Sequence, residues 1–238
     1  MKNSLIGFIP CRSGSERVKN KNTRPFGGHE KGLLELKLLQ FKEVNGLEEI
    51  IVSSNDDLVL EYAQSFSNAH DGRVTPLPRP DEWGNSATSM GEFISEYIAN
   101  LREEGDIFWT HVTHPFVTAK TYNLAIERYK EALNAGYDSF VSATKIQKFL
   151  WRDGKPFNYD NTIEKWPRSQ DLTPVYEINH AIYAMPFSRM RELGDRIGRN
   201  PYFFEMHEGD SMDIDWEDQF HLMDEISKAR ILQGISLI

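Results

Sequence analysis

Apolar residues fall into short runs that alternate with longer stretches of helical spacing. Buried β-strands, marked by adjacent apolar and β-branched residues, are expected at residues 5–9, 49–54, 74–77, 107–109, 138–145 and 181–185. Helices, marked by apolar residues three or four apart, are expected at residues 31–44, 56–66, 86–101, 118–135 and 217–232. This alternation predicts an α/β fold of three layers, with a mostly parallel sheet covered by helices.

The alternation stops after residue 145. Residues 146–178 contain three prolines and two tryptophans without clear helical periodicity. We expect one domain over residues 1–238, with this segment as an excursion from it. Its aromatic residues are typical of a subunit interface, although a loop packed back on its own domain fits the pattern as well.

The net charge of −9 argues against binding nucleic acid or an anionic membrane through a global field. Charge is nevertheless unevenly distributed. Residues 1–31 hold seven Lys or Arg against two acids, whereas residues 205–225 hold nine acids and no Lys or Arg. The segregation indicates either a basic site for an anionic substrate beside an acidic site for a metal, or two solvated charge runs.

Cysteine usage and hydropathy indicate the compartment. The single Cys11 excludes an internal disulfide, the first apolar run is too short for a signal-peptide core, and no apolar run reaches the length of a membrane span. We therefore expect a cytoplasmic protein without a membrane partner.

The loop after the first predicted strand has the composition of a polyphosphate site. A Ser-Gly-Ser turn at residues 13–15 allows backbone N–H groups to approach an anion. Full positive charges come from Arg12, Arg17, Lys19, Lys21 and Arg24. The loop contains neither the P-loop pattern nor the dinucleotide glycine fingerprint, so the design differs from both.

The pattern Ile9-Pro10-x-Arg12-x-Gly14-Ser15-x-Arg17-x-x-x-Lys21-Asn22 closely resembles the N-terminal signature of the acylneuraminate cytidylyltransferases. Similar segments follow in the family's order: Arg79-Pro80 with Ser86-Ala87-Thr88-Ser89, Val112-Thr113-His114-Pro115-Phe116, Asn179-His180-Ala181-Ile182-Tyr183 and Ser211-Met212-Asp213-Ile214-Asp215. The resemblance spans residues 4 to about 230 of the chain.

The resemblance implies a nucleotide on the basic loop. Arg12, Lys21 and the loop amides would hold the triphosphate of CTP, with Asn22 near the nucleotide and Ser15 donating to a phosphate oxygen. Arg79 and the segment containing Thr88 and Ser89 would line the nucleotide pocket. For that segment, N-capping of a helix is a simpler role, and it is compatible with ligand contact.

Asp213 and Asp215 are the candidate metal ligands. On an extended segment, two residues that stand two apart point to the same side. Carboxylates suit Mg²⁺, which takes one or two of them together with substrate phosphates and waters. Two solvated acids are the alternative, and the family resemblance favours the metal role.

The predicted acceptor site departs from the family pattern. His111, His114 and His180 stand where the resemblance implies Gln, Ser and Gly, so the identity of the acceptor is open. The His-x-x-His spacing of the first two lacks nearby cysteine, which argues against zinc. The resemblance also implies that Asn179 belongs to this site and that Arg168 pairs with the acceptor's carboxylate. A surface arginine in a mobile arm is the alternative for Arg168.

The sequence therefore predicts a Mg²⁺-dependent enzyme. The anomeric 2-hydroxyl of a sialic-acid-like 3-deoxy-2-ulosonic acid would attack the α-phosphorus of CTP and release pyrophosphate. Arg12, Lys21, Asp213 and Asp215 would carry the chemistry by positioning and charge stabilisation. The resemblance implies a homodimer. The alternatives are a nucleotidyltransferase of the same fold for an octulosonic acid or another acceptor, and a non-catalytic nucleotide-binding regulator.

Overall fold

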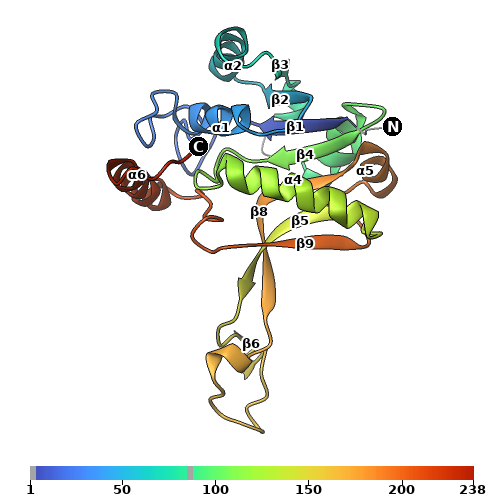
Figure 1. Ribbon diagram of the computed structural model, residues 1–238, viewed down its shortest axis with the longest axis vertical. Helices are drawn as coiled ribbons and strands as arrows, with labels where there is room; N and C mark the ends of the chain where they lie inside the picture. Colours follow the sequence, from blue (N-terminus) through green and yellow to red (C-terminus); the bar gives the residue numbers. More distant parts are fainter. Residues whose placement is uncertain (1–3, 85–87) are drawn as a thin grey trace.

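The computed structural model describes residues 4–84 and 88–238, and its core is a seven-stranded sheet (Figure 1). The strand order is β3-β2-β1-β4-β8-β5-β9. The strands are β1 (Leu5–Pro10), β2 (Glu49–Ser54), β3 (Val74–Pro78), β4 (Asp106–Thr110), β5 (Ser139–Ile146), β8 (Val175–Pro186) and β9 (Pro201–Met206). β8 runs antiparallel to β4 and β5, and the other neighbouring pairs are parallel. The predicted mostly parallel sheet is confirmed.

Helices cover both faces of the sheet, which confirms the three layers. One core contains residues of α1 (Gly32–Lys42), α2 (Asp57–Ala69), α4 (Ala119–Asn134) and α6 (Glu217–Leu232). The opposite core contains residues of η2 (Phe93–Tyr97), η3 (Ile98–Asn100) and α5 (Phe187–Leu193). β1 serves both cores because its side chains alternate: Leu5 and Ile9 pack on the first, Ile6 and Phe8 on the second.

Several elements differ from the sequence prediction, and β8 begins six residues before the strand expected at 181–185. The helix expected at 86–101 is a series of short turns, α3 (Met90–Glu92) followed by π-helical η2 and 3₁₀-helical η3, while residues 86 and 87 of that prediction lie outside the described part of the chain. α5 and the edge strand β9 were not predicted. Both are short, and β9 gains its structure from pairing with β5 rather than from a local pattern.

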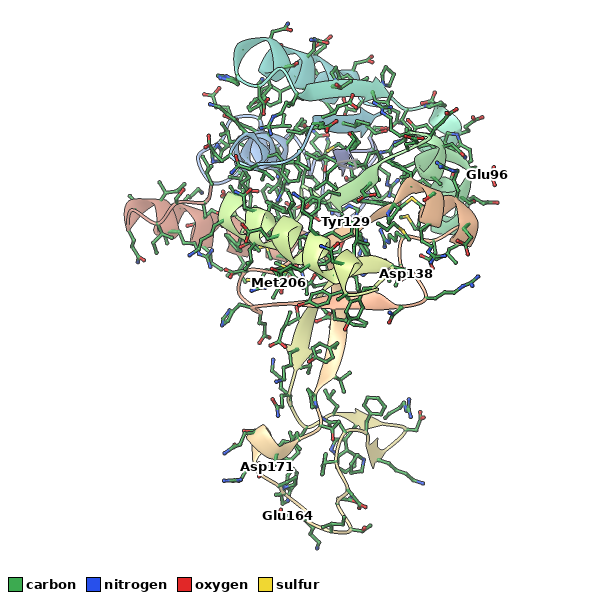
Figure 2. All side chains as sticks on the ribbon, turned by 45° about the vertical axis from the view of Figure 1, so that its right-hand side comes forward. Glu96, Tyr129, Asp138, Glu164, Asp171 and Met206 are labelled. Carbon is green, nitrogen blue, oxygen red and sulfur yellow. The ribbon has the colours of Figure 1, made fainter. Side chains whose placement is uncertain are left out.

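The segment 146–178 projects from the sheet as an arm (Figure 1). β5 and β8 stay paired beyond the sheet as far as Ile146 and Val175. The tip carries a small hairpin of β6 (Trp151–Arg152) and β7 (Lys155–Pro156), and the turn η4 (Ser169–Asp171). Asp171 and Glu164 lie at its far end, away from the sheet (Figure 2). Within the two described ranges, no helix has the length and apolar character needed to cross a bilayer.

Candidate active site

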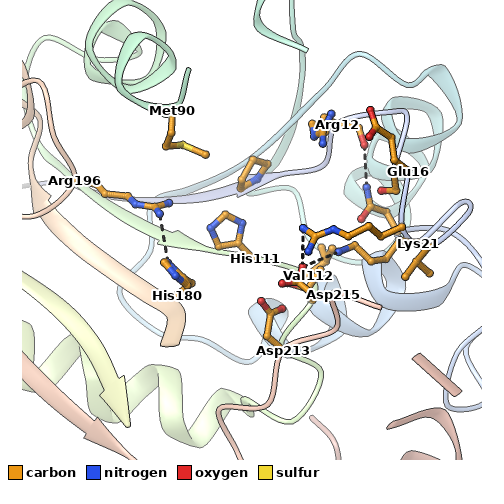
Figure 3. Close-up of a pocket in the computed structure, with 16 residues that line it drawn as sticks. Arg12, Glu16, Lys21, Met90, His111, Val112, His180, Arg196, Asp213 and Asp215 are labelled. Carbon is orange, nitrogen blue, oxygen red and sulfur yellow. Dashed lines mark hydrogen bonds and ion pairs between the residues drawn. The ribbon is translucent and has the colours of Figure 1, made fainter. Parts of the chain in front are cut away.

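A cavity of about 400 Å³ opens at the carboxyl ends of β1 and β4, where ligands bind in open α/β sheets (Figure 3). Six segments supply its walls: the loop after β1, the start of α3, the start of the loop after β4, the middle of β8, the loop after α5 and the segment before α6. They contribute Arg12, Ser15, Arg17, Lys21, Asn22, His111, His180, Asp213 and Asp215. The fold thus brings together most of the residues singled out in the sequence.

The loop after β1 is fixed by hydrogen bonds to the end of β2. The Cys11 amide donates to the Ser53 carbonyl at 2.9 Å, and the Ser13 amide donates to Oδ1 of Asn55 at 3.0 Å. Gly14 has a φ of +70° and no heavy atom within 4 Å of a Cβ built on it, so its backbone faces open space. A second hollow of about 180 Å³ runs along this loop past Ser15 and Lys19. Its open backbone and cationic rim suit phosphate groups.

Lys21 and Arg17 link the basic loop to the acidic segment. Nζ of Lys21 donates to the Ile214 carbonyl at 2.8 Å and lies 3.8 Å from Oδ1 of Asp215. Nη2 of Arg17 lies 3.3 Å from the same oxygen. Burial lowers the pKa of Lys21, while the charges of Asp213 and Asp215 oppose that shift. The basic and acidic segments therefore form one site, not two separate solvated surfaces.

The carboxylates of Asp213 and Asp215 point into the cavity (Figure 3). Oδ1 of Asp213 is buried and has no hydrogen-bond partner, and Nδ1 of His114 lies 3.8 Å from it. Oxygen atoms left unpaired in this way fit a hard cation. No cluster of three or more His, Cys, Asp or Glu suited to a metal occurs in the described ranges, so substrate and water would complete the shell of a cation here.

A third hollow of about 260 Å³ adjoins the main cavity, and Arg12 and His111 line both. Its walls include Arg79, Trp83, Thr88 and Phe93. The Arg79 guanidinium is held by Ser53, whose carbonyl accepts from Nη2 at 2.8 Å, and it lies 4.6 Å from the centre of the Phe93 ring. Fixed donors between aromatic rings are suited to a nucleobase.

The predicted segment at residues 86–89 is described only for its last two residues. Thr88 lines the third hollow and donates its hydroxyl to the Glu82 carbonyl. Ser89 is the N-cap of α3. Its Oγ accepts a hydrogen bond from the Glu92 amide at 3.1 Å, and the Glu92 carboxylate accepts one from the Ser89 amide. The capping role considered for this segment is thus present, and ligand contact by Ser89 stays a prediction.

His111 and His180 line the main cavity opposite the basic loop. Burial lowers the pKa of both imidazoles, and the charge of Arg196 adds to each shift, so both rings are neutral at pH 7. His180 has a φ of +61°, a left-handed conformation that glycine adopts without strain. That backbone explains why the family resemblance implies glycine at this position.

His114 and Asn179 are buried rather than facing the cavity. Nε2 of His114 lies 2.7 Å from the Asn179 carbonyl. The Asn179 amide is bonded to Ser142 at 2.6 Å and to Thr144 at 3.1 Å. These two residues support the walls of the site, and their contact with an acceptor stays a prediction.

Arg168 lies on the arm, with 73% of its side chain exposed, and pairs with Asp171 at 2.7 Å. The arm projects from the sheet, with Asp171 near its far end (Figure 2). The structure does not place Arg168 at the cavity, so its contact with an acceptor stays a prediction.

The sequence analysis missed Arg196, which follows α5. Its guanidinium lines the main cavity on the side opposite Lys21 (Figure 3). It follows no predicted strand and belongs to no motif, so no local signal marked it.

Comparison with known proteins identifies the class of this site. The cytidylyltransferase family profile matches residues 6–232. A pseudaminic acid cytidylyltransferase of Campylobacter jejuni is 27% identical over 197 residues, covering 77% of this chain and 78% of that protein. A CMP-N,N'-diacetyllegionaminic acid synthase of Legionella pneumophila is 25% identical over 191 residues, covering 75% and 76%. A CMP:2-keto-3-deoxy-manno-octonic acid synthetase solved with CTP shares the fold, with a TM-score of 0.64 at 12% identity over 97% of this chain and 99% of that one.

The fold and the site thus define a nucleotidyltransferase of the α/β class. The chain belongs to the cytidylyltransferase family, and it is a CTP-dependent nucleotidyltransferase.

Proposed function

We propose that the protein transfers CMP from CTP to the anomeric hydroxyl of a nonulosonic acid and releases pyrophosphate. The observation that carries this proposal is one cavity in which Arg12 and Lys21 face Asp213 and Asp215. The relatives named for pseudaminic and legionaminic acids support this acceptor class. Their 25–27% identity does not distinguish one nonulosonic acid from another.

The nucleotide would lie across the two smaller hollows. The base would bind between Trp83 and Phe93, with Arg79 as a fixed donor to its acceptor groups. The triphosphate would extend past Arg12 along the loop, toward the open backbone at Gly14. Arg12 lines all three hollows, so it is placed to contact the phosphates at the junction.

Asp213 and Asp215 would hold Mg²⁺. When bound, the cation would neutralise phosphate charge and polarise a phosphate oxygen. The protein's own contribution is to orient the two carboxylates: Lys21 and Arg17 fix Asp215, and His114 lies against Asp213.

The reaction needs positioning more than a protein nucleophile. The bond between the anomeric oxygen and the α-phosphorus forms as the bond from the α-phosphorus to the oxygen that bridges it to the β-phosphate breaks. The hydroxyl proton passes to water in the solvent-open cavity, and the pyrophosphate leaves with the electron pair of the broken bond. Negative charge accumulates on the departing pyrophosphate, where Arg12 and Lys21 stabilise it. Cys11 takes no part, because it is buried and burial raises the pKa of its thiol to about 12.

The acceptor would bind beside His111 and His180, which line the cavity opposite the basic loop. A homodimer would place the arm of one chain near the cavity of the other and bring Arg168 to the acceptor. The proposal of a dimer rests on the exposed apolar side chains of the arm, chiefly Ile163 at 86% and Trp166 at 70% exposure.

The experiment is a pyrophosphate-release assay with CTP and Mg²⁺ against pseudaminic, legionaminic, N-acetylneuraminic and 3-deoxy-octulosonic acids. Release with CTP and one nine-carbon acid, and none with ATP, GTP or UTP, is the expected result. Release with the eight-carbon acid alone would favour the octulosonic alternative. Binding of CTP by calorimetry without release on any acid would favour a regulator.

A further inference from the structure

Arg196 is a cation without a counterion inside the main cavity. Its guanidinium lies 4.2 Å from the ring centre of Tyr183 and 5.0 Å from that of Trp109. Nη1 is buried without a hydrogen-bond partner, and Nη2 has a long contact of 3.4 Å to Nδ1 of His180. Among the described residues, no carboxylate forms an ion pair with it. A half-buried charge in this state is stabilised when an anion binds.

The groups around Arg196 leave its charge unneutralised. His111 and His180 are neutral at pH 7 because burial and the arginine itself lower their pKa values. Burial raises the pKa of Tyr183, so this phenol is also neutral. The one carboxylate on the same loop is Asp195, whose charge partly offsets the effect of burial on the pKa of Arg196. Its side chain accepts hydrogen bonds from the amides of Arg196 and Ile197 and forms no ion pair with the guanidinium. This end of the cavity therefore carries one unpaired positive charge.

The remaining anions of the substrates can be assigned by elimination. The cationic loop with Arg12 and Lys21 is placed for the phosphates, and the adjoining aromatic hollow is placed for the base. A sugar acid brings one further anionic group, its carboxylate. Resting on the proposed function, we propose that Arg196 binds the acceptor's carboxylate from within the same chain.

The geometry of Arg196 suits this role better than that of Arg168. Two aromatic rings hold the planar guanidinium in place, so little side-chain freedom is lost when its N–H groups meet a carboxylate. Arg168 is exposed on the arm and already pairs with Asp171. An anchor on the cavity wall would also fix the neighbouring anomeric carbon for attack.

The test compares Arg196→Met, which keeps an unbranched side chain and removes the guanidinium, with Arg199→Met as a matched control. Arg199 is on the same loop with 75% of its side chain exposed. For Arg196→Met, the acceptor KM is expected to rise about 10- to 100-fold, because a charge-assisted pair of hydrogen bonds is lost. The CTP KM is expected to stay within about twofold of the wild-type value. For Arg196→Lys, which keeps the charge, the acceptor KM is expected to rise less than for Arg196→Met. This second variant keeps the test valid if the methionine variant misfolds.

A methyl ester of the accepted acid separates carboxylate binding from general damage. For the wild type, kcat/KM is expected to be about 10- to 100-fold lower with the ester than with the acid. For Arg196→Met, kcat/KM is expected to be nearly the same with the ester and with the acid, because the carboxylate has already lost its partner. An unchanged acceptor KM in both Arg196 variants, or a full additional ester effect in Arg196→Met, would overturn the proposal. Failure of the wild type to release pyrophosphate with any acid would instead overturn the proposed function, and this inference with it.

Discussion

Nδ1 of His114 lies 3.8 Å from Oδ1 of Asp213, and neither buried atom has a hydrogen-bond partner. The Asn179 carbonyl accepts only, so Nε2 of His114 carries the proton of the neutral ring and Nδ1 presents a lone pair to the carboxylate. In this tautomer the two atoms cannot share a hydrogen bond, so His114 acts on Asp213 by contact alone. We predict that this contact limits where the Asp213 carboxylate can move, and that His114 is a positioning residue for this candidate metal ligand.

Removing His114 should therefore weaken the response to metal. For His114→Ser, the Mg²⁺ concentration that gives half-maximal activity is expected to rise about 10- to 100-fold, as for other residues that orient metal ligands. A Mg²⁺ titration of pyrophosphate release measures this effect. His221→Ser, at an exposed site on α6, is the control, and an unchanged Mg²⁺ response in His114→Ser would contradict the positioning role.

The same histidine should make stability depend on pH. Burial lowers the pKa of His114 to about 4 from its usual 6.5. Between these values the unfolded chain binds the proton and the folded chain does not, so the free energy of unfolding falls as pH decreases, by at most about 1.4 kcal/mol per pH unit. Urea unfolding between pH 7.5 and 4.5 measures the slope. His114→Asn should have a shallower slope, and an equal slope would refute the assignment.

How far the site could be predicted from the sequence depended on whether its residues followed a recognisable strand. Arg12 and Lys21 follow β1, whose apolar run is unambiguous. Asp213 and Asp215 follow no predicted strand and were marked by their spacing together with the family resemblance. The three-layer fold could be predicted from the alternation of buried strands and helices along the chain. All four of these residues line one cavity, as the carboxyl ends of parallel strands require.

Arg196 could not be found in this way. It lines the cavity because β8 inserts between β4 and β5, and neither strand order nor antiparallel direction is encoded locally. The edge strand β9 was missed for a related reason, since its structure depends on pairing with β5. The burial of His114 likewise results from packing between segments distant in the chain.

Cys11 should be unreactive in the folded protein. Its side chain is buried, and burial raises the pKa of the thiol to about 12, so thiolate is scarce at pH 8. Iodoacetamide at pH 8 is expected to leave the native protein unmodified by mass spectrometry and to add one label after denaturation in guanidinium. Rapid labelling of the native protein would show that the thiol is accessible.

The arm should mediate self-association. Light scattering at micromolar concentration is expected to give twice the chain mass of 27.5 kDa. Ile163→Asp, at an 86% exposed position, should weaken the dimer about tenfold or more while leaving the melting temperature of the monomer unchanged. Asn161→Asp, at an exposed position on the same loop, adds the same single negative charge without removing an apolar side chain and is the matched control. A wild-type mass of one chain at these concentrations would rule out the proposed dimer.

The central claim is that Asp213, Asp215 and the basic loop join CTP to a sugar acid. Mass spectrometry of a reaction with CTP, Mg²⁺ and the accepted nonulosonic acid tests it most directly. One CMP–sugar conjugate should form for each pyrophosphate released, and Asp215→Asn should reduce the rate about 100-fold or more. The Asp215 side chain is 43% exposed, and its ion pairs with Arg17 and Lys21 are long, at 3.3 and 3.8 Å, so that variant should lose only about 1 kcal/mol of stability. The exposed Asp218→Asn should behave as wild type. Conjugate formation at the wild-type rate by Asp215→Asn, or CTP consumption without conjugate, would contradict the account.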